Sequence, residues 1–325
     1  MFYRFIKFMV RLTFLIFCRK VVFNKKELLK SKGPLLIAFN HPNSFLDAIV
    51  IDDFMQEPVW SLARGDAFKS KFAARILNAV RVMPVYRTSE GVENLSENYK
   101  TFDACLEIFR KDGLVQIFSE GKCVNEWHLR PLKKGTARLA IKAWEENIPL
   151  RVLPLGINYS SFEFFGKNIF INFGEFITAE DIDIKAPDGV RNQAFNSKLQ
   201  QQLQKLVYEI DAKDLEKQKQ LLEVNIPLWK KIVLFLPAIA GYIINAPLYL
   251  PIKYLLDKKA KGSGHYDSIM LVLLMFAYPV YLLLLTSVVY FIVGKWWVWL
   301  LLLAIPFTAW SYVQIKQQLK NVIMR

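Results

Sequence analysis

The apolar and polar positions divide the chain into three parts with different periodicities. The first part begins MFYRFIKFMVRLTFLIFCRK, in which Arg4, Lys7 and Arg11 stand at i, i+3 and i+7 and apolar residues cover most of the rest. Residues with this spacing share one face of a helix. The pattern predicts an amphipathic helix within residues 1–30 that lies in the plane of a membrane, with its basic stripe toward anionic headgroups. The alternative is a core helix of the domain that follows.

Short apolar runs alternate with helical stretches in the second part, from about residue 33 to residue 180. Strands are expected at residues 35–39, 59–63, 82–85, 114–118, 152–159 and 169–173, and helices at 69–79, 92–111 and 135–146. Continuous apolar strands separated by helices are typical of a sheet that is covered on both faces. We therefore expect an α/β domain over residues 31–225, which includes an exposed Gln-, Lys- and Leu-rich helix at 190–222.

The third part, residues 226–325, reads as a membrane region. Residues 232–252, 268–294 and 296–315 carry no formal charge, and each segment is long enough to cross a bilayer as a helix. The first segment is interrupted by prolines and has lysines on both flanks. The positive-inside rule puts both flanks in the cytoplasm, so we expect a broken or re-entrant hairpin at 232–252. The other two segments are expected to form a spanning hairpin that returns inside at Lys316, Lys320 and Arg325.

Composition and charge favour a lipid surface as the partner of this chain. The formal net charge is +14, the pI is about 9.5 and the mean hydropathy is +0.21. A basic balance of this size implies an anionic partner, and the apolar segments favour acidic headgroups over nucleic acid. We therefore expect membrane localisation, with the α/β domain on the cytoplasmic face. The 3 cysteines show no Cys-x-x-Cys spacing, which argues against a disulfide framework and a structural zinc site.

The residues with the clearest chemistry are His41 and Asp47. His41 follows the apolar strand GPLLIAFN and opens a Pro-Asn-Ser turn, at the type of strand end where α/β sheets place their sites. Imidazole titrates near neutral pH and can deprotonate a hydroxyl, while a carboxylate can orient the ring. The turn could bring the two side chains together. On residue types alone, however, a histidine near an aspartate is more often structural.

The segment NHPNSFLDAIVI resembles the first block of the glycerol-phosphate acyltransferase superfamily (PlsC-like), which includes the 1-acylglycerol-3-phosphate acyltransferases. The resemblance implies an α/β fold with a mixed sheet flanked by helices, and a catalytic dyad of His41 and Asp47. Most members have four residues between these two positions, and this chain has five. The longer spacing is similar to the branch that contains fungal glycerol-3-phosphate and dihydroxyacetone-phosphate acyltransferases.

Two further segments match the superfamily in order. MPVYR resembles the second block, whose arginine, here Arg87, binds the phosphate of the acceptor. A guanidinium group after a strand end is a good phosphate ligand in general. FSEG resembles the Phe-Pro-Glu-Gly block, with Ser119 in place of proline. The resemblance implies that Glu120 and Gly121 belong to the site that holds the glycerol-phosphate.

The chain departs from the family pattern after that block, where Lys122-Cys123 replaces Thr-Arg-Ser. The phosphate-binding role is therefore expected of Lys122, or of Arg130 and Lys133 in the string LRPLKKGTARLA. VLPLGINY, with Pro154, resembles the fourth block, which is associated with the acyl-donor side. Matches in this order cover roughly residues 30–180.

The resemblance implies a membrane-bound O-acyltransferase of phospholipid synthesis. It would move a fatty acyl group from acyl-CoA or acyl carrier protein to a hydroxyl of glycerol-3-phosphate. The alternatives are an acyltransferase that converts lysophosphatidic acid to phosphatidic acid, and a non-catalytic membrane protein that binds lipid or forms a channel. No cofactor or metal is expected, because no cluster has metal-ligand spacing. Of the other histidines, His128 is a candidate substrate contact and His265 is expected in an exposed loop.

Overall fold

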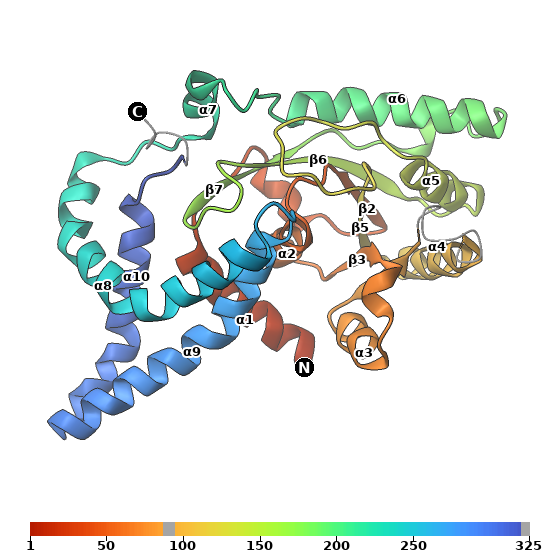
Figure 1. Ribbon diagram of the computed structural model, residues 1–325. Coiled ribbons are helices and arrows are strands. Elements are labelled where there is room, and N and C mark those ends of the chain that lie inside the picture. Colours follow the sequence, from red (N-terminus) through yellow and green to blue (C-terminus); the bar gives the residue numbers. More distant parts are fainter. Residues whose placement is uncertain (87–94, 320–325) are drawn as a thin grey trace.

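The fold is built around one seven-stranded sheet (Figure 1). The computed structural model describes residues 1–86 and 95–319, except for the side chains of residues 95–98. The strands lie in the order β1-β7-β6-β2-β5-β3-β4, and every neighbouring pair is parallel except β6 and β7. Their bounds are β1 Cys18–Phe23, β2 Leu35–Phe39, β3 Val59–Arg64, β4 Val82–Val85, β5 Leu114–Phe118, β6 Arg151–Tyr159 and β7 Lys167–Phe173. The predicted mixed α/β sheet flanked by helices is confirmed.

Both faces of the sheet are covered, which explains why its strands read as continuous apolar runs. Alternate residues of β2 enter two cores: Leu35, Ile37 and Phe39 one, and Leu36 and Ala38 the other. The first core lies under α1 (Phe2–Phe17), α2 (Phe45–Phe54) and parts of α8 (Leu228–Lys259) and α9 (Tyr266–Val293). The second lies under α4 (Leu95–Arg110), α5 (Gly135–Glu145) and α6 (Asp188–Leu206). The short helix α3 (Lys71–Ala79) has no buried residue.

The sheet contains one strand that the sequence analysis missed. Residues 18–23 were assigned to the N-terminal helical segment, yet they form β1, the edge strand beside β7. Its polar start, Arg19-Lys20, hid the strand pattern. The Arg19 side chain is buried. Its burial is compensated by hydrogen bonds, since its Nε donates to the carbonyl oxygens of Val313 and Gln314, both at 3.1 Å. These two residues lie at the end of a helix from the C-terminal part of the chain.

Residues 190–222 form two helices instead of the one expected. α6 ends at Leu206, and α7 covers Leu215–Leu222. Between them Ile210 is fully buried, and its backbone N–H donates to the carbonyl oxygen of Trp127 at 3.0 Å. This attachment to the loop after β5 breaks the helix, which a local polar pattern could not reveal.

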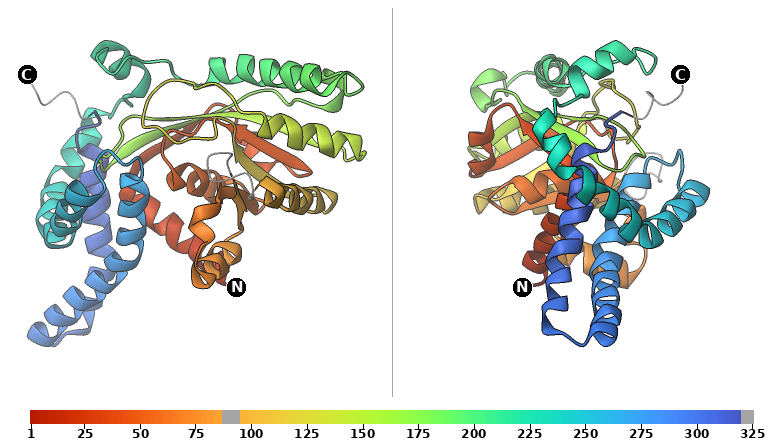
Figure 2. Two further views of the ribbon diagram at one scale, coloured as in Figure 1. Left: turned by 45° about the vertical axis from the view of Figure 1, so that its right-hand side comes forward. Right: turned by 90° about the vertical axis from the view of Figure 1, so that its left-hand side faces the viewer.

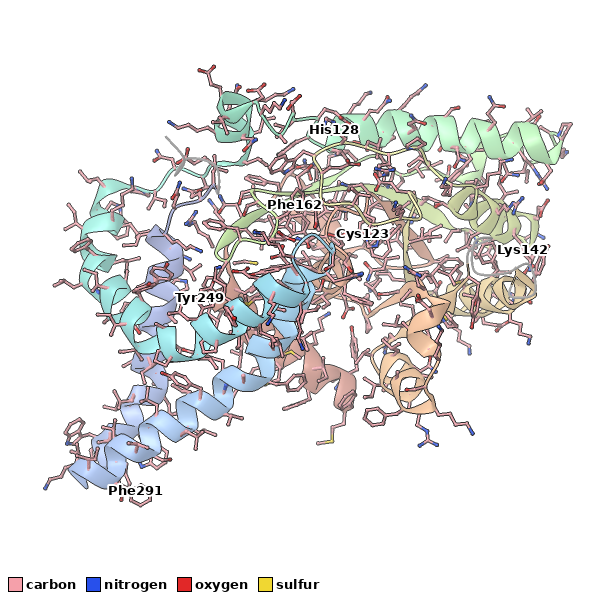
Figure 3. The ribbon with its side chains drawn as sticks, in the orientation of Figure 1. Cys123, His128, Lys142, Phe162, Tyr249 and Phe291 are labelled. Atoms are coloured by element: carbon pink, nitrogen blue, oxygen red, sulfur yellow. The ribbon has the colours of Figure 1, made fainter. Side chains whose placement is uncertain are left out.

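Three long apolar helices occupy the C-terminal third. α8 (Leu228–Lys259), α9 (Tyr266–Val293) and the 3₁₀ turn with α10 (Trp296–Ile315) are each long and apolar enough to cross a membrane. α8 and α10 come very close at Gly241, where an added Cβ would lie 2.1 Å from the carbonyl oxygen of Thr308. The paired ends of α9 and α10 project away from the sheet (Figure 2), and Figure 3 places the exposed Phe291 at their tip.

The hairpin predicted at 232–252 is wrong: the segment lies inside the single helix α8, which bends along its course (Figure 1). The helix contains Pro237, Pro247 and Pro251, and proline is the usual cause of a sharp helix bend. Residues 268–294 and 296–315 correspond closely to α9 and to the segment ending in α10. Lys320 and Arg325 lie outside the described residues.

The N-terminal helix is amphipathic as predicted, but two residues of its basic stripe, Lys7 and Arg11, contact the protein. Lys7 Nζ donates to the carbonyl oxygens of Asp52 at 2.5 Å and Met55 at 3.1 Å, and Arg11 Nη2 donates to that of Asp53 at 2.6 Å. These carbonyls form the C-terminal end of α2, which attracts cations. The outward face is an apolar stripe of exposed residues: Phe2, Phe5, Phe8, Leu12 and Leu15. The expectation that the basic stripe would face headgroups is therefore corrected for Lys7 and Arg11.

Candidate active site

His41, Asp47 and Glu120 lie where two neighbouring parallel strands end. β2 leads into residues 40–47, which we call the His41 loop, and its neighbour β5 leads into the loop that begins at Ser119. β3 and β4 end at Arg64 and Val85, which are paired in register. Parallel strands bring their following loops to one edge of the sheet, which is the usual ligand position in α/β folds.

The fold brings His41 and Asp47 together, although a continuous helix could not. The Nδ1 atom of His41 lies 2.9 Å from Oδ2 of Asp47. Ser44 makes this possible, because it adopts a positive φ of 52° just before α2 begins. The His41 side chain is 13% exposed, whereas that of Asp47 is fully buried. The arrangement leaves the histidine within reach of a ligand and keeps its carboxylate partner away from water.

The carboxylate of Asp47 is held by two further donors. The backbone N–H of Asn43 donates to Oδ2 at 2.8 Å, and the Tyr159 hydroxyl donates to Oδ1 at 2.8 Å. Complete burial raises the pKa of Asp47, while these hydrogen bonds and His41 act in the opposite direction. Tyr159 ends β6 and is itself fully buried. The sequence analysis missed its role, although it stands at the end of the VLPLGINY segment.

The ring of His41 is fixed by stacking as well as by its aspartate. It stacks on Phe118, the last residue of β5, with centroids 3.6 Å apart and an interplanar angle of 19°. The preceding residue, Asn40, exchanges two hydrogen bonds with the backbone of Ile157, at 2.8 and 3.0 Å. The position and the plane of the imidazole are thus set by β2, β5 and β6 together.

Glu120 connects the two loops that flank this histidine. Its Oε2 accepts from the backbone N–H of His41 and its Oε1 from that of Arg130, both at 2.9 Å. Burial raises the pKa of Glu120 to about 7, against the effect of these two N–H groups. The glutamate predicted to hold an acceptor therefore also holds the His41 loop in place.

The other predicted site residues divide into three groups. Gly121 has a positive φ of 66°, and an added Cβ would lie 3.0 Å from Cγ of Lys133, so this turn requires glycine. Lys122 and Lys133 are exposed, and Arg130 Nη1 lies 2.8 Å from Oε1 of Glu126. Pro154 is buried in β6 opposite Ala38, inside the sheet and not in a loop at its edge. Arg87 lies outside the described residues.

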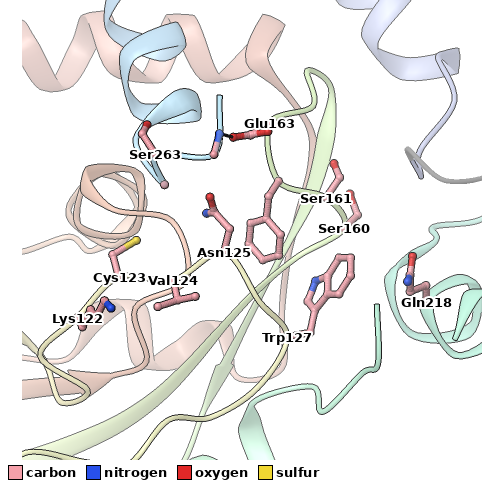
Figure 4. A pocket seen from close by; sticks show the side chains of 13 residues that line it. Lys122, Cys123, Val124, Asn125, Trp127, Ser160, Ser161, Glu163, Gln218 and Ser263 are labelled. Carbon is pink, nitrogen blue, oxygen red and sulfur yellow. Dashed lines mark hydrogen bonds between the residues drawn. The ribbon is translucent and has the colours of Figure 1, made fainter. Parts of the chain in front are cut away.

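A pocket of about 650 Å³ adjoins the His41 loop (Figure 4). Its walls are residues 122–125 and 127, the turn at 160–163, Gln218 and the connection between α8 and α9 at 262–264. The wall at 122–125 is bound to the His41 loop: the Ser44 N–H donates to Cys123 Sγ at 3.0 Å, and the Asn125 side chain donates to the carbonyl oxygen of Pro42 at 2.7 Å. Figure 3 shows Cys123 and Phe162 close to the centre of the molecule.

The two remaining histidines lie in loops on either side of the pocket. His128, the candidate substrate contact, is exposed, and its Nδ1 lies 2.7 Å from Oε2 of Glu209. His265 is exposed in the loop before α9, as expected, and its Nδ1 also lies 2.5 Å from the Ser44 hydroxyl oxygen at the site. Partial burial lowers the pKa of His265, and the nearby Arg64 and His41 act in the same direction. Arg64 is thus a further cation at this edge of the sheet that sequence reasoning missed.

The comparisons with known proteins agree with this geometry. Residues 20–158, which carry His41, Asp47 and Glu120, match the family model described as Acyltransferase. These residues form an acyltransferase domain. Within residues 1–86 and 99–319, no three His, Cys, Asp or Glu side chains are placed to hold a metal ion. The narrower resemblance to the fungal branch stays a prediction.

One solved structure to which the acyltransferase is similar is that of the 1-acyl-sn-glycerophosphate (LPA) acyltransferase PlsC from Thermotoga maritima. The identity is 15%, the TM-score is 0.43, and the match covers 62% of this chain and 78% of that chain. None of the curated proteins that were compared matches the chain.

Proposed function

We propose that the acyltransferase moves a fatty acyl group from a thioester donor to a hydroxyl of a glycerol-phosphate acceptor in phospholipid synthesis. The observation that carries the proposal is the 2.9 Å contact between His41 and Asp47 at the carboxyl edge of the sheet. The five-residue spacing of this pair favours glycerol-3-phosphate as the acceptor. Lysophosphatidic acid, whose acylation gives phosphatidic acid, is the second candidate.

The reaction follows from the orientation of the histidine. With Nδ1 held by Asp47, Nε2 of His41 accepts the proton of the acceptor hydroxyl as its oxygen attacks the thioester carbonyl carbon. The tetrahedral intermediate then breaks the carbon–sulfur bond, and the imidazolium returns the proton to the leaving thiolate. The acyl group passes directly to the acceptor, so no covalent acyl-enzyme is required.

We assign the acceptor phosphate to cations that end or follow, in the sequence, the strands with carboxyl ends at this edge of the sheet. Lys122, Arg130 and Lys133 come from the loop after β5, Arg64 ends β3, and Arg87 follows β4. A guanidinium group can bind a phosphate with two parallel hydrogen bonds, and an ammonium group contributes a compact charge. Each of these cations follows a strand whose carboxyl end lies at the His41 edge, which favours a phosphate close to the reacting hydroxyl.

A thiol-release assay tests the proposal directly. Purified protein in lipid nanodiscs is given acyl-CoA or acyl carrier protein as donor, with glycerol-3-phosphate, dihydroxyacetone phosphate or lysophosphatidic acid as acceptor. We expect one acceptor to support turnover and His41→Ala to abolish it. His128→Ala is the matched control, because that histidine is exposed and its Nδ1 lies 2.7 Å from Glu209 at the surface. Near wild-type turnover by His41→Ala would refute the base assignment, and no turnover with any acceptor would favour a non-catalytic lipid-binding protein.

We propose further that the acyltransferase domain lies on the cytoplasmic face of a membrane that α9 and α10 cross. Their apolar length supports spanning, and the lysines at 258, 259 and 261 before α9 support a cytoplasmic start. The apolar stripe of α1 and the exposed Phe72 and Ile76 of α3 are suited to the lipid surface beside them. Labelling lysines with a membrane-impermeant reagent tests this orientation: modification of Lys295 alone from outside is expected, and modification at 258–261 would refute it.

A further inference from the structure

The start of α9 contacts the His41 loop both in the buried interior and at the surface of the site. α9 begins at Tyr266, and we call residues 265–268 its N-terminal segment. Three of its four side chains bind the loop, although more than 200 residues separate them along the chain. The contacts with Asp267 and Ser268 are buried, and the contact with His265 lies at the surface of the site.

The central contact joins Asn43 to a buried ion pair. The Asn43 side-chain amide donates to Oδ2 of Asp267 at 2.7 Å, and the same oxygen accepts from Nζ of Lys167 in β7. Lys167 is fully buried and Asp267 almost so. A buried charge needs a partner with well-formed hydrogen bonds, so this aspartate is fixed in position. Because the Asn43 backbone N–H also donates to Asp47, one residue connects the fixed ion pair to the carboxylate that orients His41.

Two further contacts hold the next residues of the loop. The Ser268 hydroxyl oxygen accepts from the backbone N–H of Leu46 at 3.0 Å, and its proton is directed to the carbonyl oxygen of Asn43 at 3.4 Å. The Ser44 hydroxyl lies 2.5 Å from Nδ1 of His265. Ser44 is the residue whose positive φ turns the chain back so that His41 can reach Asp47. The N-terminal segment of α9 thus contacts each of the residues 43, 44 and 46.

We propose that His265, Asp267 and Ser268 at the start of α9 form a positioning element of the acyltransferase, which holds the His41 loop in the conformation that joins His41 to Asp47. Asn43, Asp267 and Ser268 then act through His41 without touching a substrate. The same connection supplies residues 262–264 to the wall of the pocket beside the loop (Figure 4). Folding of α9 against the domain therefore completes the site, which couples the active conformation to the membrane region. The inference rests on the proposed function.

Asn43→Ala removes the side-chain contact with Asp267, and Ser268→Ala removes the two contacts of the Ser268 hydroxyl. Both variants leave the Lys167–Asp267 pair in place. Each is expected to lower kcat at least tenfold while the KM values for donor and acceptor change less than twofold, because the histidine is misplaced and the binding residues are not. Tyr266→Phe is the matched control. It lies in the same turn and loses a hydrogen bond of 2.8 Å, but that bond goes to Asp257 of α8. A loss of kcat no larger than in Tyr266→Phe would refute the proposal.

A second measurement does not depend on turnover. Cys123 is half-buried and accepts from the Ser44 N–H, whereas Cys18 and Cys105 are buried. A loosened loop is expected to make Cys123 react with a maleimide at least several-fold faster in Asn43→Ala and Ser268→Ala than in wild type or Tyr266→Phe. Unchanged labelling in both variants would refute the positioning role even if the wild-type protein has no activity. Faster labelling without activity in wild type would overturn the proposed function alone.

Discussion

Replacing Asp47 by asparagine separates the electrostatic role of the aspartate from its role in packing. Asparagine has almost the same shape, so the fully buried site keeps its volume. The side-chain oxygen of the asparagine can accept from His41 and from the Asn43 N–H. Its amide nitrogen then faces the Tyr159 hydroxyl and can donate to the hydroxyl oxygen. All three hydrogen bonds can therefore persist. What is lost is the negative charge beside the imidazolium that forms during catalysis.

The size of the effect follows from the distance between the two charges. Nδ1 of His41 lies 2.9 Å from the carboxylate oxygen, so the charge centres are about 4 Å apart. At an effective dielectric constant of about 20, unit charges at that separation interact by about 4 kcal/mol. Loss of this stabilisation in the transition state corresponds to roughly a 10³-fold lower kcat. Burial raises the pKa of Asp47, so the neutral residue should leave stability unchanged or higher.

The assay is thiol release at saturating donor and acceptor, together with the melting temperature of the protein in detergent. Asp47→Asn is expected to combine a roughly 10³-fold loss of kcat with an equal or higher melting temperature. The reasoning would be refuted by a kcat within tenfold of wild type. It would also be refuted by a large drop in melting temperature, because the loss of activity would then reflect unfolding.

Three further predictions concern neighbouring features. Tyr159→Phe removes one hydrogen bond to Asp47, worth about 1.5–3 kcal/mol for a charged acceptor, and should lower kcat by roughly tenfold, which the same assay measures. Burial raises the pKa of Glu120 from 4.5 to about 7, so the folded state holds a proton that the unfolded state releases. This contribution to stability is complete below about pH 4.5 and is lost as the pH rises through about 7. The melting temperatures measured at pH 5 and at pH 8 should therefore differ less in Glu120→Gln than in wild type. An environment-sensitive dye on Phe8→Cys should shift to the blue in nanodiscs, whereas the same dye on Gln200→Cys, exposed on α6, should not.

Local pattern was sufficient to predict most of the sheet. The runs at β2, β4 and β5 have the predicted bounds, because strands buried on both faces must be apolar throughout and end sharply at polar turns. The charge-free lengths of α9 and α10 were equally clear, since a bilayer sets that length. The pairing of His41 with Asp47 could be predicted only with the help of the family resemblance, because their spacing fits no single helix face.

The local sequence pattern could not predict which distant residues a side chain would contact. The period of α1 predicted an amphipathic helix, but only the folded structure placed the carbonyls of Asp52 and Asp53 against Lys7 and Arg11 and turned the apolar stripe outward. The edge strand β1 was missed for a similar reason, since the buried position of Arg19 depends on the distant end of α10.

The sequence by itself thus determined the sheet except for its edge strand β1, the apolar spans, and the segment NHPNSFLD as the identifying feature of an acyltransferase domain. Only the tertiary structure decided what holds that segment in place. Tyr159 reaches Asp47 across the sheet, and His265 and Asp267 reach Ser44 and Asn43 from the start of α9. These contacts join residues that are 112 to 224 positions apart. No local periodicity encodes such contacts, because they form only when separate elements pack around one core.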